Sequence, residues 1–136
     1  MPVKKKSVSN KPVVLLVEDD PFLYKVLSAR LKDEGMDVTV ATDGEEAVLD
    51  AIKLVPTLML LDLILPKKSG FEVLKEIRKN KSTAKLPVVV LSNLGQQDDV
   101  AQMEKLGIRE YLVKADYSLT EMVEKIKEHL QSVTTS

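Results

Sequence analysis

The chain has 136 residues, of which 44% are hydrophobic and 30% are charged, and its formal net charge is -1. This length suits one domain with its own hydrophobic core, and the balanced charge argues against nucleic acid or a membrane surface as the main partner. Because the chain has no cysteine, disulfide scaffolds, thiol catalysis and thiolate metal sites are excluded. No apolar run approaches the roughly 20 residues that span a bilayer, and the run at 13–17 is too short for a signal peptide. We therefore expect a cytoplasmic protein.

The ends of the chain differ in composition from the rest. Residues 1–11, MPVKKKSVSNK, form a basic stretch, which we interpret as a flexible solvated tail and not as an arm that binds nucleic acid. Residues 12–133 are expected to form the single domain, and residues 134–136 a frayed end. No linker or internal repeat divides the chain.

Short apolar runs alternate with amphipathic helical patterns along the chain. The expected strands are VVLLV (13–17), DVTVA (37–41), TLMLL (57–61), PVVVLS (87–92) and EYLV (110–113). Such continuous apolar runs are typical of strands that are buried on both faces. Helices are expected from Pro21 to a stop at Gly35, over 44–53, after Gly70, over 98–106 and over 119–133. The alternation predicts an α/β fold in which a doubly wound parallel sheet of five strands is covered by five helices on both faces.

The expected helices carry apolar residues at helical spacing. These residues are Phe22, Val26, Leu27 and Leu31 in the first helix, Ala47, Val48 and Ala51 in the second, Val73, Leu74 and Ile77 in the third, and Met122, Val123, Ile126 and Leu130 in the last. We expect these stripes to face the sheet.

Polar and charged residues stand where four of the five strands end. They are Glu18, Asp19 and Asp20 after the first strand, Asp62 after the third, Ser92 at the end of the fourth, and Lys114 after the fifth. In an open parallel sheet, ligands bind beyond the carboxyl ends of the strands. The sequence therefore predicts that these acids, one hydroxyl and one lysine meet at the same rim.

This combination of groups suits the chemistry of phosphate. Neighbouring carboxylates repel one another unless a cation lies between them, and hard oxygen ligands suit Mg²⁺. A lysine and a hydroxyl beside a metal-bound carboxylate can hold a phosphoryl group. Asp62, which ends a buried apolar run, could then act as a nucleophile and form an acyl phosphate.

Each residue also has a simpler interpretation when it is taken alone. Asp20 is expected to cap the helix that begins at Pro21, and Asp62 could cap the turn that follows it. Ser92 could bond to local backbone, and Lys114 could be a surface charge. Four such coincidences at the ends of adjacent strands are harder to accept than one shared site, although Asp20 remains a cap.

The sequence resembles the receiver domains of bacterial two-component response regulators from about residue 11 to residue 130. The motifs that carry the resemblance are LLVEDDP, ATDGEEAV, LLDLILPKKSGFEVL, VVVLSN and GIREYLVK, in this order. The resemblance implies a flavodoxin-like fold with strand order 2-1-3-4-5. It also implies that Asp62 accepts the phosphoryl group, and that Glu18, Asp19, Asp62 and the backbone carbonyl of Ile64 hold Mg²⁺, for which Mn²⁺ can substitute.

The resemblance further implies a switch and its partners. Ser92 would be the switch hydroxyl, Lys114 the phosphate-binding lysine, and Tyr111 the aromatic residue that moves inward with the hydroxyl. A sensor histidine kinase or phosphotransfer protein would supply the phosphoryl group, and a downstream protein would bind the face made by helix four, strand five and helix five. The protein would catalyse its own phosphorylation and dephosphorylation. A homodimer is left open, and direct contact with nucleic acid or a membrane is not expected.

Two features depart from the family pattern, and a third bears on the lifetime of the phosphorylated state. The residue after Lys114 is Ala115 where receivers usually have proline, and since a cis bond to a residue other than proline costs about 2.5–4 kcal/mol, we expect a trans bond there. Nothing follows the last expected helix, so we expect no output domain. Ile64 and Leu94 are aliphatic and cannot orient an attacking water, which predicts a long-lived phosphorylated state.

Two other classes of function compete with the phosphorylated switch. A receiver-like module that binds proteins without turning over phosphate would have no need for the acids, the hydroxyl and the lysine together. A phosphatase acting through an aspartyl phosphate would need a general acid two residues after Asp62, and that position is Ile64.

Overall fold

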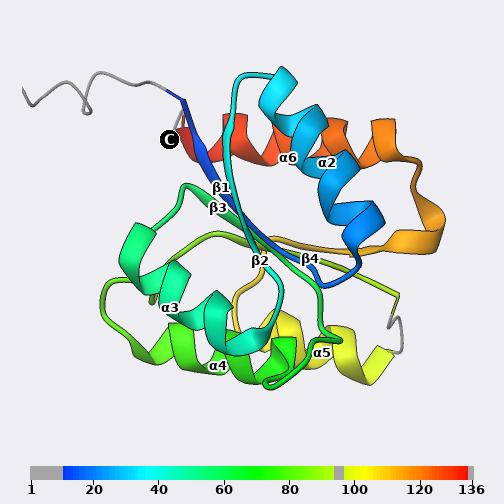
Figure 1. Cartoon of the computed structure of the whole chain (residues 1–136). Coiled ribbons are helices and arrows are strands. Elements are labelled where there is room, and N and C mark those ends of the chain that lie inside the picture. Colours follow the sequence, from blue (N-terminus) through cyan, green and yellow to red (C-terminus); the bar gives the residue numbers. More distant parts are fainter. Residues whose placement is uncertain (1–10, 94–96, 135–136) are drawn as a thin grey trace, which may run out of the picture.

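A parallel sheet of five strands forms the centre of the molecule, with helices packed on both of its faces (Figure 1). The computed structural model describes residues 11–93 and 97–134. The strands follow the order β2-β1-β3-β4-β5, so the predicted fold class and strand order are confirmed. The predictions for residues 1–10, Leu94 and residues 135–136 lie outside the described residues.

The observed elements lie within two residues of their predicted places. The strands are β1 (Val13–Val17), β2 (Asp37–Ala41), β3 (Leu58–Leu61), β4 (Val88–Ser92) and β5 (Glu110–Val113). The helices are α2 (Pro21–Asp33), α3 (Gly44–Leu54), α4 (Gly70–Lys79), α5 (Gln97–Lys105) and α6 (Leu119–Thr134). A short 3-10 helix, η1 (Lys114–Asp116), follows β5 and was not predicted.

The core consists of two layers, one on each face of the sheet. Successive side chains of a strand point to opposite faces, so in β1 Leu15 joins one layer and Leu16 the other. The first layer lies beneath α3, α4 and α5, and the second beneath α2 and α6, as the two groups of helices in Figure 1 show. The predicted stripes of α3, α4 and α6 are buried in these layers.

Two expectations about burial were wrong. The edge strands β2 and β5 are only partly buried, because each has a neighbouring strand on one side alone. Phe22 has the spacing of the α2 stripe, but its side chain is 75% exposed while Leu27 and Leu31 are fully buried. Phe22 lies in the first turn of α2, ahead of the buried residues Leu27 and Leu31.

The start signal predicted for α2 is present, and α4 begins with a capping box that was not predicted. The Asp20 side chain accepts a hydrogen bond from the Phe22 amide at 3.1 Å, with Pro21 at the first helical position. Ser69 and Glu72 form a reciprocal capping box at the start of α4. Among the residues that the structure describes, no helix combines the length and the apolar character that crossing a membrane requires.

Candidate functional site

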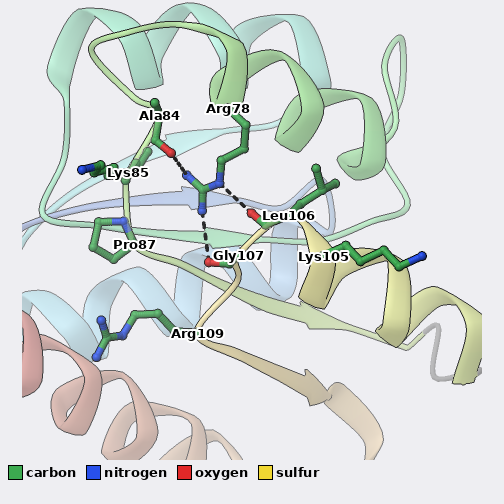
Figure 2. Close-up of a pocket in the computed structure, with 9 residues that line it drawn as sticks. Arg78, Ala84, Lys85, Pro87, Lys105, Leu106, Gly107 and Arg109 are labelled. Carbon is green, nitrogen blue, oxygen red and sulfur yellow. Dashed lines mark hydrogen bonds between the residues drawn. The ribbon is translucent and has the colours of Figure 1, made fainter.

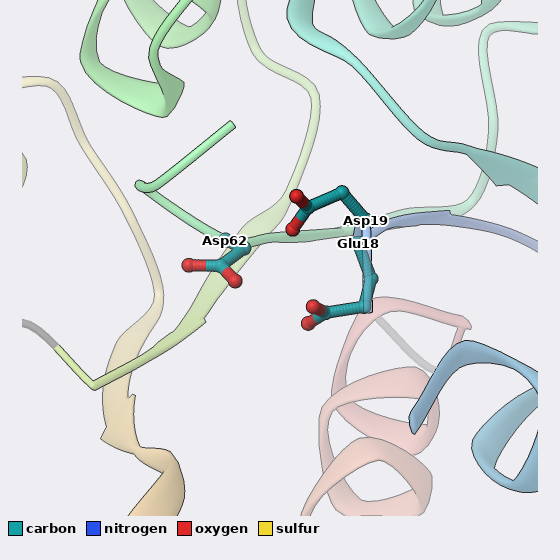
Figure 3. Close-up of side chains that lie close together, drawn as sticks. All are labelled: Glu18, Asp19 and Asp62. Atoms are coloured by element: carbon teal, nitrogen blue, oxygen red, sulfur yellow. The ribbon is translucent and has the colours of Figure 1, made fainter. Parts of the chain in front are cut away.

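Three acidic side chains converge at the carboxyl ends of β1 and β3. Glu18, Asp19 and Asp62 each offer a carboxylate oxygen that lies within 4.8 Å of those of the other two (Figure 3). Their main chain is fixed by the sheet, because the amides of Glu18 and Asp62 donate to carbonyls of neighbouring strands at 3.0 and 3.1 Å. The structure thus brings together the acids that the sequence predicted to share this rim.

Lys114 lies between the two buried acids of the cluster. Glu18 is 2% exposed and Asp62 is 5% exposed, whereas Asp19 is exposed to solvent. The Lys114 ammonium group lies 2.7 Å from Glu18 Oε1 and 2.7 Å from Asp62 Oδ2. Buried carboxylates are costly unless they are paired, so one lysine compensates two of them here.

The electrostatics of the cluster agree with this geometry. Burial raises the pKa of Glu18, and the negative charge of Asp62 adds to the effect while the hydrogen bond from Lys114 opposes it. Burial by itself would lower the pKa of Lys114, but its hydrogen bonds to Asp62 and Glu18 outweigh burial and raise that pKa. Lys114 is therefore a cation at neutral pH.

Asp62 Oδ1 is also fixed by hydrogen bonds. Ser92 is fully buried at the end of β4, and its hydroxyl donates to Asp62 Oδ1 over 2.7 Å. The amide of Ile64 donates to the same oxygen over 3.1 Å. Asp62 thus accepts hydrogen bonds from a hydroxyl, an amide and an ammonium group, which fix the orientation of its carboxylate.

Two glycines set the path of the loop that follows Asp62. A Cβ atom on Gly70 would lie 2.4 Å from the carbonyl oxygen of Asp62, and one on Gly44 would lie 2.0 Å from that of Lys68. The Gly44 amide also donates to the Pro66 carbonyl over 3.1 Å. The LPKKSG segment therefore packs closely against the first turn of α3, and only glycine fits at both contacts.

Tyr111 lies on β5, half-buried, and packs against the core layer beneath α3, α4 and α5. Burial raises the pKa of its phenol to about 12, and the negative charges of Asp99 and Asp62 add to this shift. The phenol is therefore neutral at physiological pH. Its predicted role as a moving aromatic residue remains a prediction.

The loop after Lys114 differs from the family pattern in a way that has a local explanation. Among the residues that the structure describes no peptide bond is cis, so the bond between Lys114 and Ala115 is trans, as predicted. The Ala115 amide donates to Asn93 Oδ1 over 3.0 Å, a bond that proline could not make. Sequence reasoning missed Asn93, although it is the last residue of the VVVLSN motif.

The residues of this rim fit a divalent cation. Carboxylate oxygens are the hard ligands that Mg²⁺ prefers, and the exposed Asp19 leaves the cluster open to solvent. The Asp20 side chain, by contrast, caps α2, and the Asp20 amide donates to Glu18 Oε2 over 3.1 Å. Asp20 is thus a structural residue, as predicted. The Ile64 amide donates a hydrogen bond to Asp62 Oδ1, and the Ile64 carbonyl remains a predicted metal ligand.

Known proteins resemble this chain in sequence and in fold. The transcriptional regulator RpaA of Synechocystis is 37% identical over 116 residues, which cover 85% of this chain and 48% of RpaA. This chain spans about half the length of the curated relatives it matches.

Two solved structures also resemble this chain. One is the receiver domain of the sensor histidine kinase PA1611 from Pseudomonas aeruginosa, whose structure has Mg²⁺ coordinated in the active-site cleft. Its TM-score is 0.79 at 28% identity, and the match covers 93% of this chain and 99% of that receiver domain. The Mn²⁺-bound response regulator Rcp1 has a TM-score of 0.76 at 35% identity and covers 86% of this chain and 92% of its own.

The profile of the response regulator receiver domain matches residues 14–127. This match begins one residue inside β1, spans the other four strands and the first half of α6, and includes the acidic cluster, Ser92 and Lys114. The chain belongs to the family of response regulator receiver domains of two-component systems.

Proposed function

We propose that this receiver domain accepts a phosphoryl group on Asp62 from a histidine kinase or phosphotransfer protein and acts as a signalling switch. The observation that carries the proposal is the environment of Asp62. Its carboxylate is 5% exposed, lies at the end of the central strand, and contacts both the Lys114 ammonium group and the Ser92 hydroxyl at 2.7 Å. A carboxylate needed only as a cap has no use for a lysine and a second acid beside it.

The transfer step requires few groups from the protein. A carboxylate oxygen of Asp62 forms a bond to phosphorus while the bond between phosphorus and the partner's imidazole nitrogen breaks. The electron pair returns to that nitrogen, and a proton on the other ring nitrogen leaves the imidazole neutral. Lys114 offers positive charge to the phosphoryl oxygens, which is the main task of a protein in phosphoryl transfer.

Glu18, Asp19 and Asp62 would hold Mg²⁺, with the carbonyl of Ile64 as a further ligand. Receiver domains bind Mg²⁺ at an acidic pocket, and the converging oxygens of these three side chains form such a pocket here. When bound, the ion supplies positive charge that offsets the repulsion between the acids and an incoming phosphoryl group.

The signal would leave the site through Ser92. Its hydroxyl donates to Asp62 Oδ1 before phosphorylation, and a phosphoryl oxygen offers it a new acceptor. We expect this exchange to shift the loop after β4 and to let Tyr111 follow. The downstream protein would then read the face made by α5, β5 and α6, through two packings that differ by a few kcal/mol.

The experiment that tests the proposal uses a small phosphodonor and Mg²⁺, with intact mass as the readout. The parent protein should gain one phosphate, which hydroxylamine should remove because it cleaves acyl phosphates. Asp62→Asn should gain none. The matched control is Asp20→Asn at the same rim, because asparagine caps a helix as well as aspartate does and this variant should be phosphorylated like the parent.

Two results would overturn the proposal. Equal phosphorylation of the parent and Asp62→Asn would remove Asp62 as the acceptor. A parent protein that gains no phosphate from the donor or from a phosphorylated histidine kinase would instead favour a protein-binding module that does not turn over phosphate.

A further inference from the structure

A cleft of about 490 Å³ opens at the amino end of the sheet, on the opposite side from the acidic cluster. Its walls are the loop between α4 and β4 and the loop between α5 and β5 (Figure 2). Four cationic side chains line it, and no Asp or Glu is among its lining residues: the cations are Arg78, Lys85, Lys105 and Arg109. The two segments that carry them, 78–87 and 105–109, contain no acidic residue at all.

Arg78 fixes the floor of the cleft. Its guanidinium donates to the carbonyl oxygens of Leu106 at 2.7 Å, Thr83 at 3.2 Å, Ala84 at 3.3 Å and Gly107 at 3.4 Å. These bonds tie the two walls together and satisfy the donors. They do not neutralise the charge, because within residues 11–93 and 97–134 no carboxylate forms an ion pair with Arg78. Burial accordingly lowers the pKa of Arg78.

The three other cations stand at the rim and also lack anionic partners. Lys85 and Lys105 are exposed on opposite walls, and neither forms a salt bridge with a carboxylate in the described part of the chain. Arg109 donates to Ser132 Oγ at 2.6 Å and to His129 Nδ1 at 3.4 Å, and neither atom carries negative charge. In a protein whose net charge is -1, this is a local concentration of uncompensated positive charge.

The surface between these cations is only partly apolar. Leu86, Pro87 and Leu106 line the cleft together with the aliphatic stems of the lysines. The acidic character of the whole protein, with a pI of about 5.9, disfavours nucleic acid. A peptide that carries carboxylates beside an aliphatic side chain matches both the charge and the apolar surface.

We propose that this cleft is a docking site for an acidic peptide segment of a partner protein. Carboxylates of the segment pair with Lys85, Lys105 and Arg109, and an aliphatic side chain packs on Pro87 and Leu106. Arg78 keeps the walls at a fixed separation and adds its charge from below. The site lies at the opposite end of the strands from Asp62, and phosphorylation of that residue is not needed for docking.

The test uses a short fluorescent peptide of aspartate and glutamate around a central leucine, with fluorescence anisotropy as the readout. The full chain should bind it saturably at low ionic strength, and added salt should weaken the binding. Lys85→Glu with Lys105→Glu should weaken it about tenfold or more, since two favourable charge pairs become repulsive. The matched control is Lys25→Glu with Lys53→Glu, two exposed lysines outside the cleft whose replacement changes the net charge equally.

Three outcomes would overturn the proposal. The first is no saturable binding of the peptide, and the second is an equal loss of binding in the cleft variant and the control variant, which would indicate attraction to net charge alone. The third is tighter binding of a single-stranded oligonucleotide of the same charge. Replacement of the central leucine of the peptide by serine should also weaken binding, and unchanged binding would remove the apolar part of the site.

Discussion

At the carboxyl end of the sheet three acids cluster and one lysine pairs with two of them, whereas at the amino end four cations line a cleft with no Asp or Glu among its described lining residues. The acidic end keeps its charges among its own side chains, and two of its acids are buried. The basic end satisfies Arg78 with backbone carbonyls, and within residues 11–93 and 97–134 its rim cations form no ion pair with a carboxylate. Under the two proposals made above, the acidic end serves phosphoryl transfer at Asp62, and the basic end binds an acidic segment of a partner protein.

The largest effect is expected from removal of the guanidinium that holds the basic end together. Arg78→Leu should lower the free energy of unfolding by about 3 kcal/mol, because four carbonyl oxygens lose a charged donor and the two walls lose their link. Chemical denaturation measures this change. The neighbouring exposed Lys79→Leu should stay within about 0.5 kcal/mol of the parent. Similar stability of the two variants would show that Arg78 is dispensable for the fold.

A smaller effect is expected to distinguish Asp19 from Asp20 at the carboxyl end of the sheet. Mg²⁺ at ten times its dissociation constant should stabilise the parent by about 1.4 kcal/mol, seen as a higher melting temperature. Asp19→Ala should lose most of this gain, because an exposed ligand of the cluster is removed. Asp20→Ala should lose about 1 kcal/mol of baseline stability as its cap is lost, and should keep the gain from Mg²⁺. The reverse pattern would place the metal on Asp20.

The two ends of the sheet show which site residues could be predicted from the sequence and which could not. Asp62, Ser92 and Lys114 were predicted because polar residues that directly follow apolar strands stand out, and parallel strands bring their ends together. Arg78 and Asn93 were missed, since each binds backbone atoms of a distant segment and a bond to a main-chain group leaves no pattern in side-chain identity. The expected burial of Phe22 was wrong, because helical spacing predicts the direction of a side chain and not whether another element covers it.

The smallest effect concerns Glu110, the acid that follows Arg109 directly in the chain. It pairs with His129 at 2.7 Å and with Lys125 at 3.2 Å on α6. Burial by itself would raise the pKa of Glu110, but the hydrogen bonds from His129 and Lys125 outweigh burial and lower it. A carboxyl group whose pKa is lowered in the folded state stabilises the fold at any pH above its unfolded-state pKa. This contribution is lost as the pH falls through its folded-state pKa.

Glu110→Gln should therefore be less stable than the parent at pH 7 by at most about 1 kcal/mol, and the gap should close as the pH falls below 4.5. Denaturation curves across this pH range measure it. Glu104→Gln on α5, whose exposed side chain makes no ion pair within the described residues, should follow the parent at every pH. A gap that widens in acid would mean that the carboxyl group is not stabilised by its two neighbours on α6.

The close contacts of Gly44 and Gly70 have a consequence for how this chain can vary through evolution. One added methyl group at either position would collide with main chain of the loop after Asp62, at 2.0 Å from the Lys68 carbonyl or 2.4 Å from that of Asp62 itself. Neither glycine contributes a chemical group to the acidic cluster, yet both restrict the path of the chain next to the Asp62 carboxylate. Sequence drift around this site is thus limited by two residues that place no side chain in it.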